Sequence, residues 1–165
     1  MQHQSNVSIT AKEWLHGGQA LSWRLVFPGR GDQAKPARSF VGSFFAESER
    51  EDDAKLIACE LISNALLHSR SGDPGGWFGV EVRRGRLMRI AVQDLGGRGV
   101  PRPVSSAARP TLAVGGRGLR AVSDLSAGWG VCGTPETGHL VWADVAVNAP
   151  SGWACRGGGH EPPVR

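Results

Sequence analysis

The feature that most constrains the fold is a helix predicted over residues 51–69. Apolar side chains occupy most sides of this segment: Ile57, Cys59, Leu61, Ile62, Ala65 and Leu66. Its first turn is acidic, which suits the positive end of a helix dipole, and a Gly- and Pro-rich stretch follows it. A helix that is apolar on most sides must be covered by other elements. The chain therefore needs a sheet or further helices around this segment.

Alternating apolar residues predict five strands, and a shorter apolar pattern predicts two more helices. The strands are expected at residues 20–27, 77–83, 87–93, 128–132 and 139–147, and the helices at 36–47 and 118–126. The tight, glycine-containing link between the second and third strands indicates a hairpin. The order of these elements predicts an α+β protein, a two-layer α/β sandwich with one sheet covered on one face by helices.

The length of the chain, 165 residues, fits one domain. We expect residues 1–18 to be a flexible N-terminus, 19–148 to form the domain, and 149–165 to be a disordered tail. Residues 95–117 are predicted to form a lid, because a Gly-, Pro-, Ser- and Arg-rich loop of this length is unusual inside a compact domain.

Composition argues against several classes of protein. No apolar stretch is long enough for a membrane span, and the N-terminus has no signal-peptide core, so a cytoplasmic location is expected. No histidines or cysteines have metal-ligand spacing. The net charge is +4, with 16 Arg against 3 Lys, which indicates either a surface for phosphates or acidic partners or a simple bias in composition. Aromatic residues are not interleaved with the arginines, so direct nucleic-acid binding is not expected.

Two polar residues interrupt the apolar surface of the predicted helix. Glu60 and Asn64 are four residues apart, so they share one helix face. Burying either one costs free energy unless a partner satisfies it. One interpretation is a polar helix edge, with Glu60 capping a neighbouring loop. The other is a nucleotide site, in which Asn64 binds a nucleotide-held Mg²⁺ and Glu60 acts as a general base.

An acidic residue follows the third predicted strand. Asp94 could accept a hydrogen bond from an exocyclic amine such as that of adenine, and Gly96 would let the base approach the backbone closely. Asp94 could equally be a solvated turn residue.

A glycine-rich turn precedes the last predicted helix. Gly116 and Gly118 would leave backbone amides free to bind an anion at the helix start, and Arg117 could add charge-assisted bonds to a phosphate. A flexible hinge is the alternative. The chain lacks the G-x-x-x-x-G-K-[ST] pattern, which excludes a P-loop, and the turn does not follow a strand, which argues against a Rossmann fingerprint.

Taken together, these segments resemble a known family. Residues Glu60–His68 are similar to the N box of the ATP-binding fold shared by histidine kinases and DNA gyrase. Asp94–Gly96 resembles its G1 box, and Gly116–Leu119 its G2 box. The compact size and the segment Val141–Val145 are most similar to anti-sigma factor serine kinases, especially small ATP-binding regulators of actinomycete type. The resemblance covers about residues 37–147.

The resemblance implies a Bergerat-type (GHKL, histidine kinase-like ATPase) fold with a mixed, mostly antiparallel sheet. It also implies ATP and Mg²⁺ as cofactors. Asn64 would ligate the Mg²⁺, Asp94 and Gly96 would bind adenine, and Gly116, Arg117 and Gly118 would hold the phosphates.

The function implied is that of an ATP-binding anti-sigma factor and serine-protein kinase that regulates transcription by partner switching. Glu60 would be the base that activates a serine on an anti-anti-sigma partner of the STAS type. A sigma factor would be the other partner, and a homodimer is expected, with no direct nucleic-acid or membrane binding.

A departure from the family pattern supports an alternative function. In Asp94-Leu95-Gly96-Gly97-Arg98-Gly99, the last glycine is one residue out of step with D-x-G-x-G. The alternative is a catalytically inactive module, with or without nucleotide, that sequesters a regulator by binding it.

Overall fold

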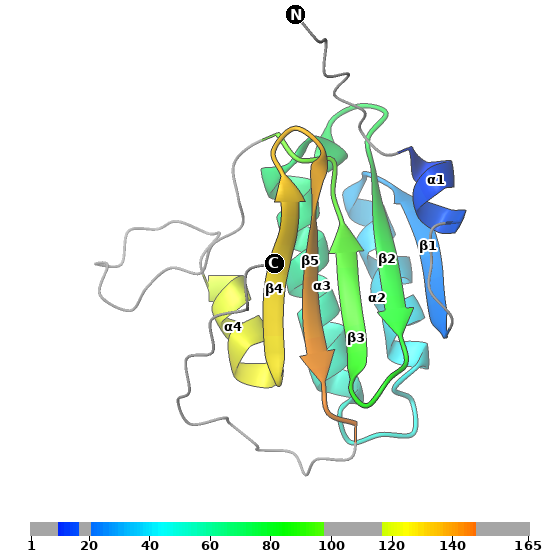
Figure 1. The fold of residues 1–165 in the computed structure, drawn as a ribbon, viewed down its shortest axis with the longest axis vertical. Coiled ribbons are helices and arrows are strands. Elements are labelled where there is room, and N and C mark those ends of the chain that lie inside the picture. The colour runs from blue at the N-terminus through cyan, green and yellow to red at the C-terminus, as the bar shows by residue number, and fades with distance from the viewer. Residues whose placement is uncertain (1–9, 17–20, 98–116, 148–165) are drawn as a thin grey trace, which may run out of the picture.

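The computed structural model describes residues 10–16, 21–97 and 117–147, and the expectations for 1–9, 17–20, 98–116 and 148–165 lie outside these residues. Five strands form one sheet in the order β1-β2-β3-β5-β4 (Figure 1). The strands are β1 (Ser22–Pro28), β2 (Trp77–Arg83), β3 (Met88–Gln93), β4 (Gly128–Thr134) and β5 (Gly138–Val145). All five predicted strands are therefore present, with ends shifted by a few residues.

Every pairing between these strands is antiparallel. The expected mixed sheet is therefore wrong for the part of the chain that the structure describes. The reason lies in the last hairpin, which places β5, and not β4, beside β3. Strands β3 and β4 run in the same direction, but β5 separates them, so they never pair (Figure 1).

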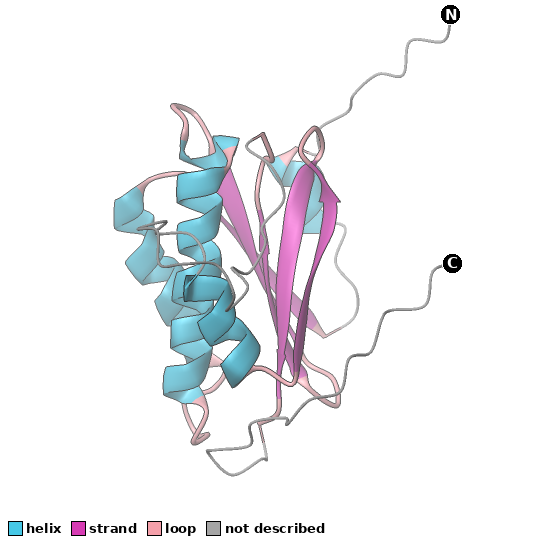
Figure 2. Cartoon of the chain, turned by 90° about the vertical axis from the view of Figure 1, so that its left-hand side faces the viewer, coloured by secondary structure: helices cyan, strands magenta, loops and turns pink. Residues whose placement is uncertain are grey.

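Three helices cover one face of the sheet (Figure 2). They are α2 (Ala34–Ser43), α3 (Glu51–His68) and α4 (Arg117–Leu125), and α3 packs against both of the others. Short 3₁₀ turns, η1 (Gly31–Gln33) and η2 (Arg70–Gly72), precede α2 and follow α3. The expected α+β two-layer sandwich is confirmed. Among the described helices, none combines the length and the apolar character needed to cross a bilayer.

The core lies between the sheet and α3. Alternate residues of β2 point toward the helices, and Phe78, Val80 and Val82 are completely buried there. From α3, Ile57 and Leu61 enter the same cluster. Burying a large apolar side chain stabilises the fold by about 1.5–3 kcal/mol, so the apolar surface of α3 is the main reason that helix and sheet stay together.

The end of α2 differs from the prediction. The helix was expected to continue to residue 47, but it stops at Ser43. The amides of Phe44 and Phe45 donate to the carbonyls of Val41 and Gly42, three residues back, at 3.1 and 2.9 Å. These tighter turns end the helix and place Phe45 in the core, where it is 1% exposed.

A buried arginine joins the start of α3 to the end of α4. Arg50 Nη2 donates to the carbonyl of Leu125 at 2.6 Å, a favourable place for a cation because the last carbonyls of a helix carry negative charge. Arg50 Nε lies 3.2 Å from Asp53 Oδ2, close enough for an ion pair although the N–H is not aligned for a hydrogen bond. Arg50 therefore fixes the position of α4 beside α3.

A fourth helix, α1 (Ala11–His16), lies on the opposite face of the sheet, in a segment expected to be flexible. Gly79 lies between Phe78 and Val80, so its missing Cβ would point away from the core, and that Cβ would meet the Trp14 ring at 2.8 Å. Trp14 is 3% exposed. The guanidinium of Arg24 lies 4.6 Å from the ring centroid. The prediction of a flexible N-terminus is therefore wrong for residues 11–16, because one aromatic side chain anchors this segment to the sheet.

On the same face of the sheet, a second tryptophan packs against a glycine. A Cβ at Gly130 would lie 2.7 Å from the Trp142 ring, and the Arg89 guanidinium lies 3.9 Å from the centroid of that ring. Arg89 also binds both oxygens of Asp144, each at 2.7 Å. These hydrogen bonds raise the pKa of the Arg89 guanidinium above its ordinary value. On the outer face of the sheet, these side chains therefore hold β3 and β5 together, in addition to the backbone hydrogen bonds between the two strands.

The packing of α1 predicts strong coupling between Trp14 and Gly79. Trp14→Ala should lower the free energy of unfolding by about 3 kcal/mol. Gly79→Ala should cost about 1–3 kcal/mol in the natural chain, because its methyl group collides with the ring, but almost nothing once Trp14 is alanine. Urea unfolding of the two single variants and the double variant measures this. Additive effects would show that α1 does not pack on Gly79.

Candidate functional site

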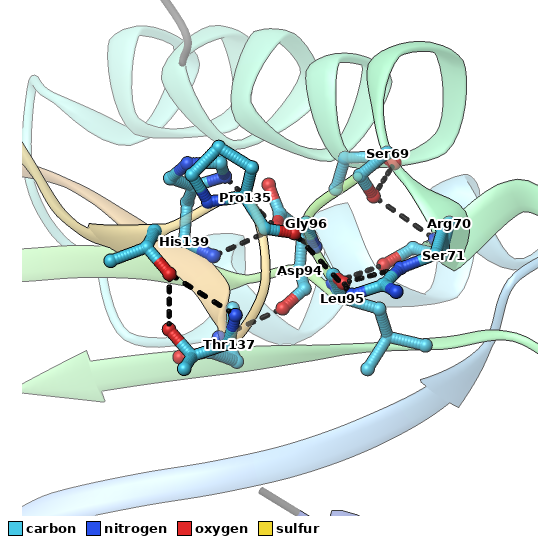
Figure 3. Close-up of polar contacts among 12 residues, drawn as sticks. Ser69, Arg70, Ser71, Asp94, Leu95, Gly96, Pro135, Thr137 and His139 are labelled. Carbon is cyan, nitrogen blue, oxygen red and sulfur yellow. Dashed lines mark hydrogen bonds and ion pairs between the residues drawn. The ribbon is translucent and has the colours of Figure 1, made fainter. Parts of the chain in front are cut away.

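The residues that directly follow α3 are hydrogen-bonded to the loop that follows β3. The amide of Arg70 donates to the carbonyl of Gly96 at 2.7 Å, and the amide of Leu95 donates to Ser71 Oγ at 3.0 Å (Figure 3). Ser69 forms an isolated β-bridge with Gly97. The Asp94–Gly97 loop is consequently held in place against α3.

The side chain of Arg70 extends these contacts to the turn between β4 and β5. Its Nη2 donates to the carbonyl of Leu95 at 2.7 Å and to that of Glu136 at 3.0 Å, and Nε also donates to Leu95, at 3.0 Å. A Cβ on Gly97 would lie 2.7 Å from Arg70 Cγ, so the arginine lies directly over the loop. One side chain thereby joins three segments that are distant in sequence.

Asp94 is at the centre of this arrangement and is 4% exposed. Its Oδ1 accepts hydrogen bonds from the amide of Gly96 at 2.6 Å and from the amide of His139 at 2.8 Å. The amide of Asp94 in turn donates to the carbonyl of His139 at 2.8 Å. Asp94 is not the solvated turn residue that was one alternative. It is a buried residue that joins the loop to the start of β5.

Gly96 has a structural function in the same loop. It adopts φ +67°, in the left-handed region that favours glycine. A Cβ there would also lie 2.8 Å from the carbonyl carbon of Pro135. The loop and the hairpin turn can approach each other this closely only because residue 96 has no side chain.

Glu60 and Gly118, which have separate roles in the nucleotide interpretation, lie against each other. A Cβ on Gly118 would overlap Glu60 Oε2 and would lie 3.1 Å from Glu60 Cδ. Glu60 is half-buried, and within the described residues its carboxylate makes neither an ion pair nor a hydrogen bond. Gly118 is in the first turn of α4, so the Glu60 carboxylate lies at the start of that helix, where the helix dipole favours negative charge.

Asn64 lies one turn further along α3 and is 9% exposed. Its Nδ2 is buried with no hydrogen-bond partner in the described structure. Turning the amide by 180° would put Oδ1 in that position, because the two amide atoms have nearly the same shape. A buried polar atom without a hydrogen-bond partner lowers the free energy of unfolding by about 1–3 kcal/mol, and a bound ligand that supplies a partner would recover this loss. The site therefore fits a group that offers a polar atom or a metal ion to Asn64.

Glu60, Asn64 and Ser69, the residue that follows α3, lie at successive levels along the helix axis. Ser69, which contacts the Asp94 loop, follows Glu60 by nine residues, a rise of about 13 Å along the helix. Asn64 lies between them. Any ligand that touches both Asp94 and Glu60 must therefore be elongated.

Two of the predicted phosphate-binding residues cannot be placed. Gly116 lies outside the described residues, and Arg117 is described only as the first residue of α4, without its side chain. Of the predicted lid, residues 95–97 and the backbone of residue 117 are described. Among the described residues, no group of three His, Cys, Asp or Glu side chains could hold a metal ion.

Sequence reasoning missed His139, which is 1% exposed. Its Nδ1 lies 3.4 Å from Asp94 Oδ1, and its Nε2 is another buried polar atom with no hydrogen-bond partner in the part of the chain that the structure describes. The signal was available, because His139 precedes Val141 and Ala143 with the period of two that marks the core face of β5. A histidine in that register is a polar residue at an apolar position.

No family model matches this chain, and no curated protein matches it either. The interpretation of the site therefore depends on its residues and geometry.

The bonds to Asp94 predict different outcomes for two substitutions. Asp94→Ala leaves two buried amides without an acceptor and should lower the free energy of unfolding by about 3 kcal/mol. Asp94→Asn keeps an acceptor oxygen and should cost much less. Chemical denaturation of both variants compares them. Equal losses would mean that the charge of Asp94, and not the acceptance of these two bonds, stabilises the fold.

Proposed function

We propose that this chain has a Bergerat-type ATP-binding fold and acts as an anti-sigma factor and serine-protein kinase. One observation carries the proposal. Glu60 and Asn64 lie one turn apart on α3, and each presents a polar group with no partner in the described residues, while the missing side chain of Gly118 lets the Glu60 carboxylate lie against the start of α4. The α+β sandwich, with helices on the face that holds these groups, is compatible with this fold.

The residues present fit a nucleotide that lies along α3. The orphaned amide of Asn64 suits an oxygen-coordinated Mg²⁺, which commonly takes only one or two protein ligands and keeps phosphate and water as the others. Within the described residues, the hydrogen bonds that the Asp94 carboxylate accepts all use Oδ1, so Oδ2 is the atom that would accept from the exocyclic amine of adenine. Mg²⁺ would neutralise charge on the transferred phosphoryl group.

Glu60 supplies the acid–base chemistry in this proposal. The hydroxyl of a partner serine attacks the γ-phosphorus of ATP, the bond from that phosphorus to the β–γ bridging oxygen breaks, and ADP leaves. Glu60 accepts the hydroxyl proton. Its exposure is intermediate, which lets it stay near the surface where a protein substrate can reach it.

The proposed partners are a sigma factor and an anti-anti-sigma protein of the STAS type, and the proposed location is the cytoplasm. We also expect a homodimer, and a measurement of the mass of the protein in solution tests this prediction.

Asn64→Leu should separate stability from binding. The leucine has the same branched shape and removes the buried orphan, so the free energy of unfolding without nucleotide should rise by about 1 kcal/mol. The Kd for Mg²⁺-ATP should rise at least about tenfold, because a ligand is lost. Calorimetry and urea unfolding measure the two effects. Ser63→Ala, on the same helix, is the control. Unchanged affinity in Asn64→Leu would reject Asn64 as a ligand.

Glu60→Gln tests the general base. Transfer of phosphate to a cognate anti-anti-sigma protein should fall by about 10²–10⁴-fold, while the affinity for ATP stays the same. The matched control is Glu51→Gln, which removes a carboxylate from the first turn of the same helix, where it pairs with Lys55. Equal rates in the natural protein and Glu60→Gln would remove Glu60 as the base.

A specific observation also favours the alternative, a non-catalytic module that binds and sequesters a regulator. The Asp94 loop is already held by hydrogen bonds to η2, within itself and to the start of β5, which gives it a structural function without nucleotide. Titration of the natural protein with Mg²⁺-ATP tests the nucleotide-free form of this module. Binding at micromolar concentration would count against that form, whereas no binding would count against the kinase.

A further inference from the structure

A hollow of about 560 Å³ lies at the other end of the sheet from Asp94. Its lining includes Trp23 from β1, Phe44 from the end of α2, Met88 from the start of β3, and the β2–β3 connection. Met88, at the start of β3, lines this hollow, and the six residues of the strand span about 20 Å before the Asp94 loop. Figure 1 shows β3 running between these two ends of the sheet. The hollow is thus separate from the candidate nucleotide site.

One wall of the hollow is aromatic and continues onto an exposed apolar surface. The ring centroids of Trp23 and Phe44 lie 5.0 Å apart. Trp23 and Leu25 pair with Val82 and Val80, so both are on the helix-facing side of β1, yet they are 41% and 43% exposed. They lie on an edge strand, where no further strand covers them in the described sheet. Contiguous exposed apolar side chains mark interaction surfaces.

The rim of the hollow is positive. Arg84 and Arg86 are exposed on the β2–β3 connection, and neither guanidinium makes an ion pair or a hydrogen bond within the described residues. None of the described residues that line the hollow is acidic. Tryptophan and arginine are also the residue types that dominate binding energy at protein interfaces. An apolar centre with a charged rim is the usual arrangement of such an interface.

We propose that this hollow docks an acidic segment of a partner protein, which inserts a bulky apolar side chain against Trp23 and Phe44 and places carboxylates beside Arg84 and Arg86. A protein segment fits better than a small molecule, because a small-molecule site encloses most of its ligand. Here the apolar surface continues out of the hollow onto Leu25, and the arginines are exposed at its rim. This docking goes beyond the proposed function and does not depend on nucleotide.

The test uses the full chain and a fluorescein-labelled octapeptide with a Leu-Phe pair between three acidic residues on each side. Fluorescence anisotropy should show binding that weakens as salt is added. Arg86→Glu should weaken it roughly tenfold, because an attraction becomes a repulsion. Arg38→Glu is the matched control, since it makes the same change in charge on an exposed residue of α2 outside the hollow, and it should have little effect.

Two further peptides and one further measurement complete the test. Replacing Leu-Phe by Ala-Ala, or the six acids by lysines, should abolish binding. Equal affinity of Arg86→Glu and Arg38→Glu, or equal affinity for the alanine peptide, would overturn the proposal. Sedimentation that shows a dimer broken by Arg86→Glu would also overturn it, because a second copy would then be the occupant. The Kd for Mg²⁺-ATP should be the same in Arg86→Glu, so failure here and failure of the kinase proposal are distinguishable.

Discussion

The acceptance of two backbone hydrogen bonds by one oxygen of Asp94 is the interaction on which the candidate site depends. The amides of Gly96 and His139 are buried, and Oδ1 satisfies both. An unpaired buried amide costs more than a made hydrogen bond contributes, so the loop and the start of β5 must stay together. Arg70 reinforces this junction from outside through backbone carbonyls. The end of α3, the loop after β3 and the last hairpin therefore behave as one unit.

Much of the fold follows from local patterns. Helix α3 and strands β2 and β3 were placed within a few residues, because burial on several sides and alternation with a period of two are strong signals. The order of the strands was harder to predict. Whether β4 or β5 lies beside β3 depends on how the last hairpin docks, and no local residue specifies that choice. The position of α1 was missed for a related reason, since Trp14 has an anchoring function only where Gly79 lies beneath it.

The site was predicted in part. The spacing of Glu60 and Asn64 placed both on one face of α3, and Gly118 does lie against Glu60. Asp94 was interpreted as either an adenine-binding residue or a solvated turn residue. The structure excludes the second alternative, because Asp94 is buried and accepts two backbone hydrogen bonds, and adenine binding is still a proposal. Arg70 could not be foreseen, because its partners are carbonyls, which every residue carries. The roles of these residues in binding ATP and in catalysis remain proposals, since they depend on a ligand and a partner.

The glycines beneath the two tryptophans constrain how sequences of this kind can diverge. Neither Gly79 nor Gly130 has the positive φ that Gly75, Gly96 and Gly138 adopt, so each is glycine because of the neighbouring ring and not because of its own backbone. A lineage that lost the aromatic ring at position 14 would free position 79 for a β-branched residue, which strands favour. We therefore expect positions 14 and 79 to change together during evolution, whereas the glycine at position 96 should persist whatever happens to either tryptophan.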